Sequence, residues 1–237
     1  ALRAQWGIES VTADLTLLSK LQPTLRKGKW QVTVALYRDH AGGAARITEI
    51  WPGLHEGGLY GLAIDLGSTT IAAHLTDLDT GAVIASSGIM NPQIRFGEDL
   101  MSRVSYAMMN PGGDKEMTAA VREALNDLTR AIAEEGGIDP NLILETVFVC
   151  NPVMHHLLLG LDPVELGQAP FALASSDSMR LGALEMGLDA MNPRARIYVL
   201  PCIAGHVGAD AAAVALSEQP GKSEDLVLIV DVGTNAE

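Results

Sequence analysis

Leu62-Ala63-Ile64-Asp65-Leu66-Gly67-Ser68-Thr69 has a counterpart later in the chain, Leu228-Ile229-Val230-Asp231-Val232-Gly233-Thr234-Asn235. Each copy is a short apolar run followed by Asp, an apolar residue, Gly and two small polar residues. The run predicts a buried strand, and the glycine allows a tight turn whose backbone N–H groups can bind an anion. One copy alone is typical of an ordinary hairpin turn. Two copies, each opening a predicted α/β unit, favour phosphate binding.

The aspartates of the two copies, Asp65 and Asp231, are expected at the ends of their strands. A carboxylate repels a phosphate, so direct contact between them is unfavourable. A Mg²⁺ ion that keeps several of its waters can lie between the two groups. We therefore expect Asp65 and Asp231 to hold Mg²⁺ through water.

The composition is that of a folded globular protein. The 237 residues are 48% apolar and 19% charged, which allows a sizeable core and argues against global disorder. We identify no signal peptide and no apolar run long enough to cross a membrane. The two cysteines, Cys150 and Cys202, fit a reducing cytoplasm and cannot supply the four thiolates of an iron–sulfur cluster.

The formal net charge of −13 is unevenly distributed. Residues 1–58 hold seven basic and five acidic residues (net +2), whereas residues 59–237 hold nine and twenty-four (net −15). The change marks a domain boundary near residue 58. An acidic main body argues against nucleic-acid binding, which requires a basic face.

Residues 1–58 are predicted to form a small α+β domain. Leu15–Leu25 has the apolar spacing of a helix, Trp30–Tyr37 alternates like a strand, and Arg46–Trp51 is a second strand stopped by Pro52. The expected linker to the next domain is Glu56-Gly57-Gly58.

Residues 59–225 are predicted to form a mixed five-stranded sheet with helices on both faces, an α/β fold. The expected strands are 60–65, 71–77, 82–88, 146–150 and 196–200, and the expected helices are 97–108, 117–134, 152–159 and 208–218. Residues 162–192, rich in Pro, Ser and Met, are interpreted as an irregular insertion. Residues 226–232 are predicted as the first strand of a further subdomain, to which residues 226–237 are assigned.

In such sheets, ligands bind beyond the carboxyl ends of the strands. Besides the aspartates, the predicted strand ends carry Cys150, Asn151 and Cys202. Asn151 can orient a water or contact a phosphate, or it can cap the helix that starts at Pro152; the sequence favours neither role. Cys150 is interpreted as a small buried residue rather than a reactive thiol.

Gly205-His206-Val207-Gly208-Ala209-Asp210 leads into a predicted helix. A helix N-terminus can hold an anion, and glycines allow another backbone to approach closely. Gly208 and Asp210 are therefore candidate nucleotide-binding residues. The alternative is that Asp210 only stabilises the helix dipole.

Several segments together resemble the reductive activators of corrinoid proteins, which belong to the acetate and sugar kinase, heat-shock chaperone and actin superfamily. The two phosphate turns alone indicate only the superfamily, whereas the matches within 91–103 and 205–210 are specific to the activators. The resemblance covers nearly the whole chain. The matching segments are Tyr60–Thr70, Asn91-Pro92-Gln93, Gly97–Arg103, His155–Gly160, Leu200-Pro201 with Gly205–Asp210, and Asp231–Asn235.

This resemblance implies an actin-like, ribonuclease H-like ATPase subdomain that uses ATP and Mg²⁺. It implies catalytic roles for Asp65, Asn151 and Asp231. The residues that it implies for nucleotide binding are Gly67, Ser68, Thr69, Thr70, Gly208, Asp210, Gly233, Thr234 and Asn235. In the family, ATP binding and hydrolysis help to drive an electron onto inactive Co(II) of a corrinoid methyltransferase protein, which is the expected partner. A homodimer is also expected.

The chain departs from the family pattern at several positions. The family usually has Gly-Asn-Thr where this chain has Cys150-Asn151-Pro152, Phe at His206 and Gly at Ala236. Pro152 removes a hydroxyl and an N–H group near the expected γ-phosphate. The family's N-terminal [2Fe–2S] domain and the second ATPase subdomain, with its adenosine pocket, are expected in a longer protein of which this chain is a part, so the fragment alone is expected to be inactive.

Two other classes of function remain open. A small-molecule kinase of the same superfamily would need polar groups for a sugar or carboxylate, and the sequence shows no such set. The acidic surface and the single half of a nucleotide site would fit a non-enzymatic docking or assembly module.

Overall fold

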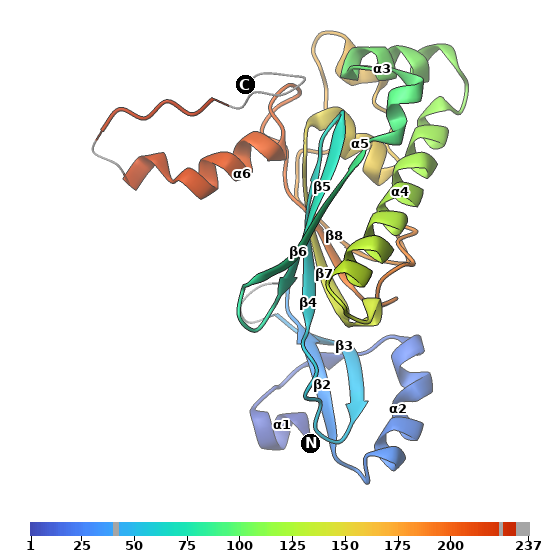
Figure 1. The fold of residues 1–237 in the computed structure, drawn as a ribbon, viewed down its shortest axis with the longest axis vertical. Coiled ribbons are helices and arrows are strands. Elements are labelled where there is room, and N and C mark those ends of the chain that lie inside the picture. Colours follow the sequence, from blue (N-terminus) through green and yellow to red (C-terminus); the bar gives the residue numbers. More distant parts are fainter. Residues whose placement is uncertain (40–42, 223–224, 231–237) are drawn as a thin grey trace.

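The computed structural model describes residues 1–39, 43–222 and 225–230, which contain two separate sheets (Figure 1). The N-terminal sheet has three strands in the order β1-β3-β2, with β1 parallel and β2 antiparallel to β3. Helix α2 packs on β3 through Leu17, which is fully buried. The elements here are α1 (Leu2–Trp6), β1 (Val11–Thr12), α2 (Leu15–Lys27), β2 (Val32–Tyr37) and β3 (Ala45–Pro52).

The predicted strand Trp30–Tyr37 begins two residues late. Lys29 and Trp30 have positive φ angles of 51° and 69°, so they form a turn after α2 instead of extended backbone. The N–H of Trp30 donates to the carbonyl of Leu25 at 2.7 Å, and its indole is exposed. The prediction was wrong for Trp30, because the alternating pattern extends by chance into the turn.

The second sheet confirms the predicted α/β class but has six strands instead of five, in the order β6-β5-β4-β7-β9-β8. Strands β4, β7 and β9 are parallel, and β5, β6 and β8 run antiparallel to their neighbours. The bounds are β4 (Tyr60–Leu66), β5 (Thr70–Asp77), β6 (Val83–Met90), β7 (Ile143–Cys150), β8 (Met179–Gly182) and β9 (Arg196–Val199).

The unpredicted strand β8 lies inside the segment 162–192, which was expected to be irregular. It has four residues, too few for a clear pattern, and it pairs with the equally short β9. The Arg180 guanidinium lies 4.7 Å from the ring centre of Tyr198 on β9, a cation–π contact across the pair. Downstream of β8, the segment places Ala183, Met186 and Leu188 in the core.

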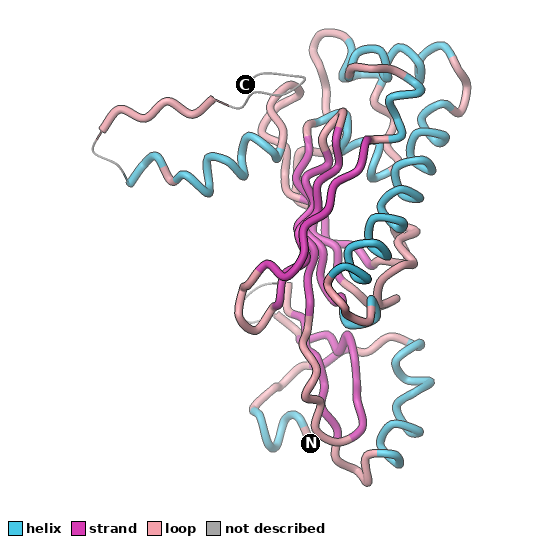
Figure 2. Tube along the Cα trace, viewed as in Figure 1, coloured by secondary structure: helices cyan, strands magenta, loops and turns pink. Residues whose placement is uncertain are grey.

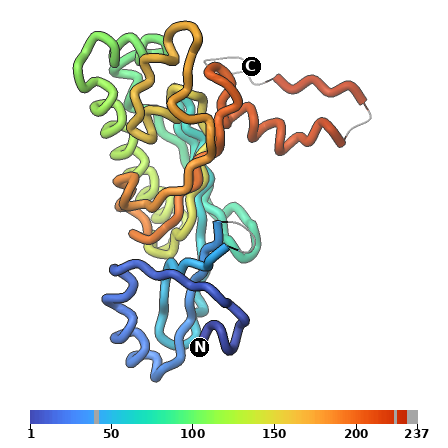
Figure 3. The backbone as a smooth tube through the Cα atoms, turned by 180° about the vertical axis from the view of Figure 1, so that it is seen from behind, coloured from blue at the N-terminus to red at the C-terminus, as the bar shows by residue number. Residues whose placement is uncertain are grey.

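Helices lie on both sides of this sheet (Figures 1 and 3). Helix α4 packs against β5 and β6, and α5 packs against α4 and β7, so both cover one face. Helix α6 contacts β7 from the other side and then extends away from the sheet. The helices are α3 (Leu100–Met109), α4 (Gly113–Glu135), α5 (Pro152–Leu159) and α6 (Ala209–Glu218), with 3₁₀ turns at Pro92–Phe96, Pro140–Leu142, Val164–Gly167 and Pro220–Lys222.

The core lies between the sheet and the helices α4 and α5. Alternate residues of β4 and β5 face it, which is the two-residue period of a strand with one buried face. Residues that are at most 1% exposed there include Leu66, Ile71, Leu125, Phe148 and Leu157. The opposite face of β4 and β5 carries the exposed Ala63, Asp65 and His74.

Residues 226–230 form neither strand nor helix, although a strand was predicted at 226–232 (Figure 2). Leu226 and Leu228 are exposed, and the segment joins neither sheet. A strand needs a neighbour for its backbone groups, and residues 226–230 pair with no strand of the described part of the chain. Residues 231–237 lie outside the described residues. None of the helices in the described ranges combines the length and apolar character of a membrane span.

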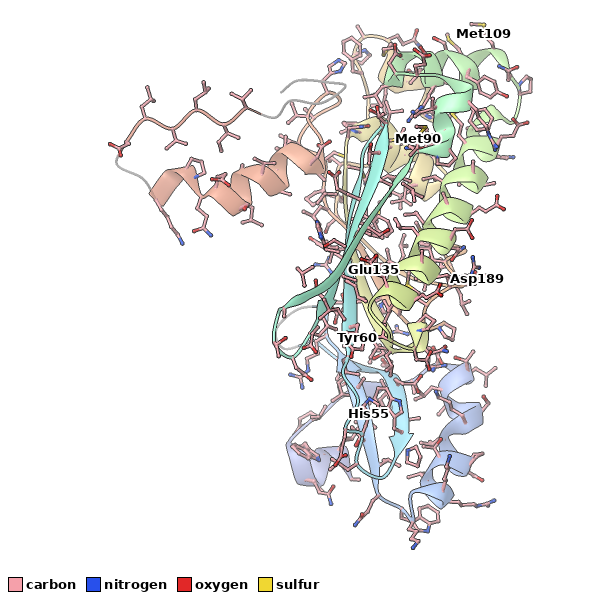
Figure 4. All side chains as sticks on the ribbon, viewed as in Figure 1. His55, Tyr60, Met90, Met109, Glu135 and Asp189 are labelled. Atoms are coloured by element: carbon pink, nitrogen blue, oxygen red, sulfur yellow. The ribbon has the colours of Figure 1, made fainter. Side chains whose placement is uncertain are left out.

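A buried polar cluster links β3 to residues 192–194, which lie between β8 and β9. Figure 4 labels His55 and Tyr60 on the chain that leads from β3 into β4. Glu49 on β3 accepts hydrogen bonds from Lys20 on α2, from Asn192 at 2.8 Å and from Arg194 at 2.5 Å. Arg194 also donates to the carbonyl of Thr48 at 2.7 Å. Burial alone would raise the pKa of Glu49, but bonds from Lys20, Ile50 and Asn192 and the charge of Arg194 outweigh it and lower the pKa.

This cluster should fix the small domain to the sheet. We predict that Glu49→Gln lowers the free energy of unfolding by ~3–5 kcal/mol, because the buried Arg194 then loses the carboxylate with which it is paired. Urea denaturation would measure the change. Arg130→Met removes an exposed pair with Asp127 and should cost less than ~1 kcal/mol. Equal losses in the two cases would show that the cluster is not a stabilising joint.

Candidate functional site

The first phosphate turn connects β4 to β5 at the carboxyl end of β4. Strand register pairs Leu66 with Cys150, so the turn begins beside the point where β7 ends and α5 starts. Gly67 is needed here because a Cβ atom on it would lie 2.6 Å from the carbonyl oxygen of Thr70. Ser68 is buried, whereas Thr69 and Thr70 are exposed. The turn therefore presents its two threonines to solvent at the strand-end edge of the sheet.

The carbonyl oxygens of this turn accept hydrogen bonds from residues in the protein interior. Asn91, which is fully buried, donates from Nδ2 to the Gly67 oxygen and from its backbone N–H to the Thr69 oxygen, both at 2.8 Å. Arg103 on α3 donates from Nη2 to the Ser68 oxygen at 2.5 Å. The carbonyls of three consecutive residues thus have fixed partners.

The N-terminus of α6 approaches the same edge, as the glycine-rich segment predicted. A Cβ atom on Gly208 would lie 2.6 Å from both the Cα of Asn151 and the carbonyl oxygen of Cys150, so only glycine fits this position. Asp210 lies in the first turn of α6 and is half-buried. Asn151 caps α5: its Oδ1 accepts from the N–H of Met154 at 2.9 Å. The capping alternative for Asn151 is therefore realised, and its catalytic role stays a prediction.

Two buried thiols, Cys150 and Cys202, lie at this edge, and nearby groups shift their pKa values. Burial raises the pKa of the Cys150 thiol well above its usual range, and the neighbouring Cys202, Asp210 and Asp65 raise it further. Burial and Asp210 raise the pKa of Cys202 to about 11. Both thiols are thus held neutral, which agrees with the interpretation of Cys150 as a filler.

The structure brings three of the predicted groups together: the turn with Asp65, the Asn151 cap, and the α6 entry with Gly208 and Asp210. The remaining predicted site residues, Asp231, Gly233, Thr234 and Asn235, lie outside the described residues. Within residues 1–39, 43–222 and 225–230 there is no cluster of three or more His, Cys, Asp or Glu side chains able to hold a metal ion. Two carboxylates, Asp65 and Asp210, fit Mg²⁺, because that ion keeps several waters and takes few protein ligands.

Sequence reasoning flagged the segment 91–103 but missed what it does. Asn91 and Arg103 support the turn from inside. One signal was present in the sequence: Arg103 lies in the first turn of α3, where a cation opposes the helix dipole. A residue in such an unfavourable position is expected to have a specific partner.

The close contact at Gly208 gives a direct test. We predict that Gly208→Ala lowers the free energy of unfolding by ~1–3 kcal/mol, because the new methyl group overlaps the backbone at Cys150 and Asn151. Gly221→Ala is the matched control, since a Cβ atom there meets nothing within 4 Å. Thermal or urea unfolding of both variants would compare them. If Gly208→Ala is as stable as the wild type, α6 does not pack against this edge.

Comparison with known proteins identifies the family. The family model described as the RACo linker region matches residues 1–57, and the one described as the RACo middle region matches residues 60–221. The corrinoid activation enzyme RamQ of Eubacterium limosum is 34% identical over 179 residues, which are 76% of this chain and 30% of that protein. A solved reductive activator for a corrinoid, iron–sulfur protein is 31% identical, with a TM-score of 0.87 over 99% of this chain and 37% of that one. The chain thus spans about a third of the length of these relatives, and it belongs to the RACo family.

Proposed function

We propose that this chain is the linker domain and the first nucleotide-binding half of an ATP-dependent reductive activator of a corrinoid protein. The observation that carries the proposal is the turn after β4, whose carbonyls are occupied from inside while the exposed Asp65 stands beside it. The structural match to a solved reductive activator over 99% of the chain supports it.

Each residue of the site has a proposed role. The backbone N–H groups of Ser68 and Thr69 and the hydroxyls of Thr69 and Thr70 bind phosphate oxygens. Asp65 and Asp231 hold Mg²⁺ through its waters. When bound, Mg²⁺ supplies positive charge that neutralises the phosphate oxygens. Asp231 with Gly233, Thr234 and Asn235 forms the matching turn on the other side of the nucleotide.

The chemistry of this site is positioning and electrostatic stabilisation, with little covalent chemistry by the protein. The described residues offer hydrogen-bond donors, hydroxyls and carboxylates, which suffice for that task. Asn151 orients the attacking water in this proposal, in addition to capping α5.

In the whole protein, a [2Fe–2S] domain outside this chain would pass one electron to Co(II) of a corrinoid methyltransferase protein, which becomes Co(I). ATP binding and hydrolysis at this site would be coupled to that transfer. A homodimer and a cytoplasmic location complete the proposal. These statements extend the family resemblance to the full-length protein.

Asp65 tests the proposal. In the full-length protein, we predict that Asp65→Asn weakens Mg·ATP binding and slows ATP-dependent reduction of Co(II) by about 10–100-fold, because an outer-shell ligand of the ion is lost. The fold should remain, since Asp65 is exposed. Calorimetry with Mg·ATP and the visible spectrum of the corrinoid would measure the two effects.

Asp79→Asn is the control, because it removes the same charge from an exposed turn that joins β5 to β6. It should leave binding and rate unchanged. Wild-type binding and rate for Asp65→Asn would contradict the proposed site. Formation of ADP that depends on an added sugar or carboxylic acid would instead indicate a kinase, and absence of nucleotide binding in the full-length protein would indicate a docking module.

A further inference from the structure

Arg103 is a buried cation that no carboxylate contacts among the residues the structure describes. The exposed fraction of Arg103 is 0%, whereas an arginine side chain normally reaches solvent. None of the ion pairs among the described residues includes it. Burial lowers the pKa of Arg103 to about 10, and the charge of Asp99 acts in the opposite direction. The guanidinium therefore stays charged at neutral pH.

Neutral acceptors surround this charge. Nη2 donates to the Ser68 carbonyl at 2.5 Å and Nε to the Gly97 carbonyl at 2.9 Å. Nη1 lies 3.2 Å from the sulfur of Met154 and 3.5 Å from Oε1 of Gln93. Burying a charge without a counter-ion is costly, so a structural role alone would be served better by a neutral side chain. An anion that binds on the far side of the turn would supply the missing counter-charge.

The geometry of the peptide group connects Arg103 to that far side. In a trans peptide, the C=O of one residue and the N–H of the next point in opposite directions. The Ser68 carbonyl points to Arg103, so the N–H of Thr69 points away from it. The Gly67 carbonyl points to Asn91, so the N–H of Ser68 likewise points outward. A cation bonded to the carbonyl also polarises the peptide and strengthens its N–H as a donor.

We propose that Arg103 is a positioning residue for nucleotide phosphate: it orients and polarises the Ser68–Thr69 peptide from inside and contributes positive potential to the turn without touching the ligand. The inference rests on the proposed nucleotide site and assigns this role to a residue outside the phosphate motif. Asn91 orients the neighbouring Gly67–Ser68 peptide in the same way, but its side chain is a neutral amide.

Binding to the full-length protein tests the role with three probes, Mg·ATP, inorganic pyrophosphate with Mg²⁺, and adenosine. Arg103→Met should lower the affinity for both phosphate-bearing probes by at least about tenfold. This is the ratio expected when one charge-assisted hydrogen bond, here that of Arg103 to the Ser68 carbonyl, is lost. Adenosine affinity should not change, because adenosine has no phosphate. Arg103→Lys should retain most of the affinity, and raised salt should weaken pyrophosphate binding less in Arg103→Met than in wild type.

Arg122→Met is the matched control. Arg122 on α4 is half-buried and, among the described residues, donates to one carbonyl, from Nε and Nη2 to the Leu158 oxygen at 3.0 and 2.8 Å; burial lowers its pKa as well. Its contact lies at the carboxyl end of α5, whereas the turn lies beside the amino end, so its loss should destabilise the fold without changing any of the three affinities. This control separates loss of a buried arginine from loss of this arginine.

The outcomes are distinguishable. If wild type binds Mg·ATP and folded Arg103→Met binds it equally well, the inference is wrong and the proposed site stands. If the affinity for adenosine falls as much as the affinity for pyrophosphate, Arg103 is only structural and the inference is again overturned. Should Arg103→Met fail to fold, Arg103→Gln applies the same criteria, because its amide keeps one donor and no charge. Failure of wild type to bind any phosphate-bearing probe would overturn both the proposed function and this inference.

Discussion

Peptide planarity at the turn after β4 is the constraint on which the proposed site depends. Because Asn91 and Arg103 take the carbonyl oxygens of Gly67 and Ser68, the N–H groups of the following residues face outward. The donors are therefore pre-organised for an anion, and preorganised dipoles stabilise charge without reorganisation cost. The segment 91–103 supplies both supports from within thirteen residues.

The rest of the second sheet places other groups around this turn. Pairing of β4 with β7 puts Asn151 next to Gly67, and the missing side chain at Gly208 lets α6 enter at the same edge. The opposite end of β4 carries the small domain, fixed through Glu49 and Arg194. The joint and the proposed site thus lie at opposite ends of the second sheet.

Elements set by local pattern were predictable from the sequence. Helix α5 was bounded correctly by Asn151-Pro152 at its start and Gly160 at its end, and the close approach at Gly208 followed from the glycine spacing. Interactions between distant positions were not predictable. Glu49 and Arg194 are 145 residues apart, Ser68 and Arg103 are 35 apart, and strand β8 is defined by its partner β9 more than by its own four residues. Local periodicity contains no information about such pairings.

The central claim, that the turn 67–70 is a phosphate site built by its inner supports, is tested most directly by a structure of the full-length protein with Mg²⁺ and a non-hydrolysable ATP analogue. The account predicts phosphate oxygens within hydrogen-bond distance of the N–H groups of Ser68 and Thr69, with Asp65 on the side of the metal ion and the bonds of Asn91 and Arg103 to the turn retained. A nucleotide bound elsewhere, or one whose phosphates contact this turn only after those two bonds break, would contradict it.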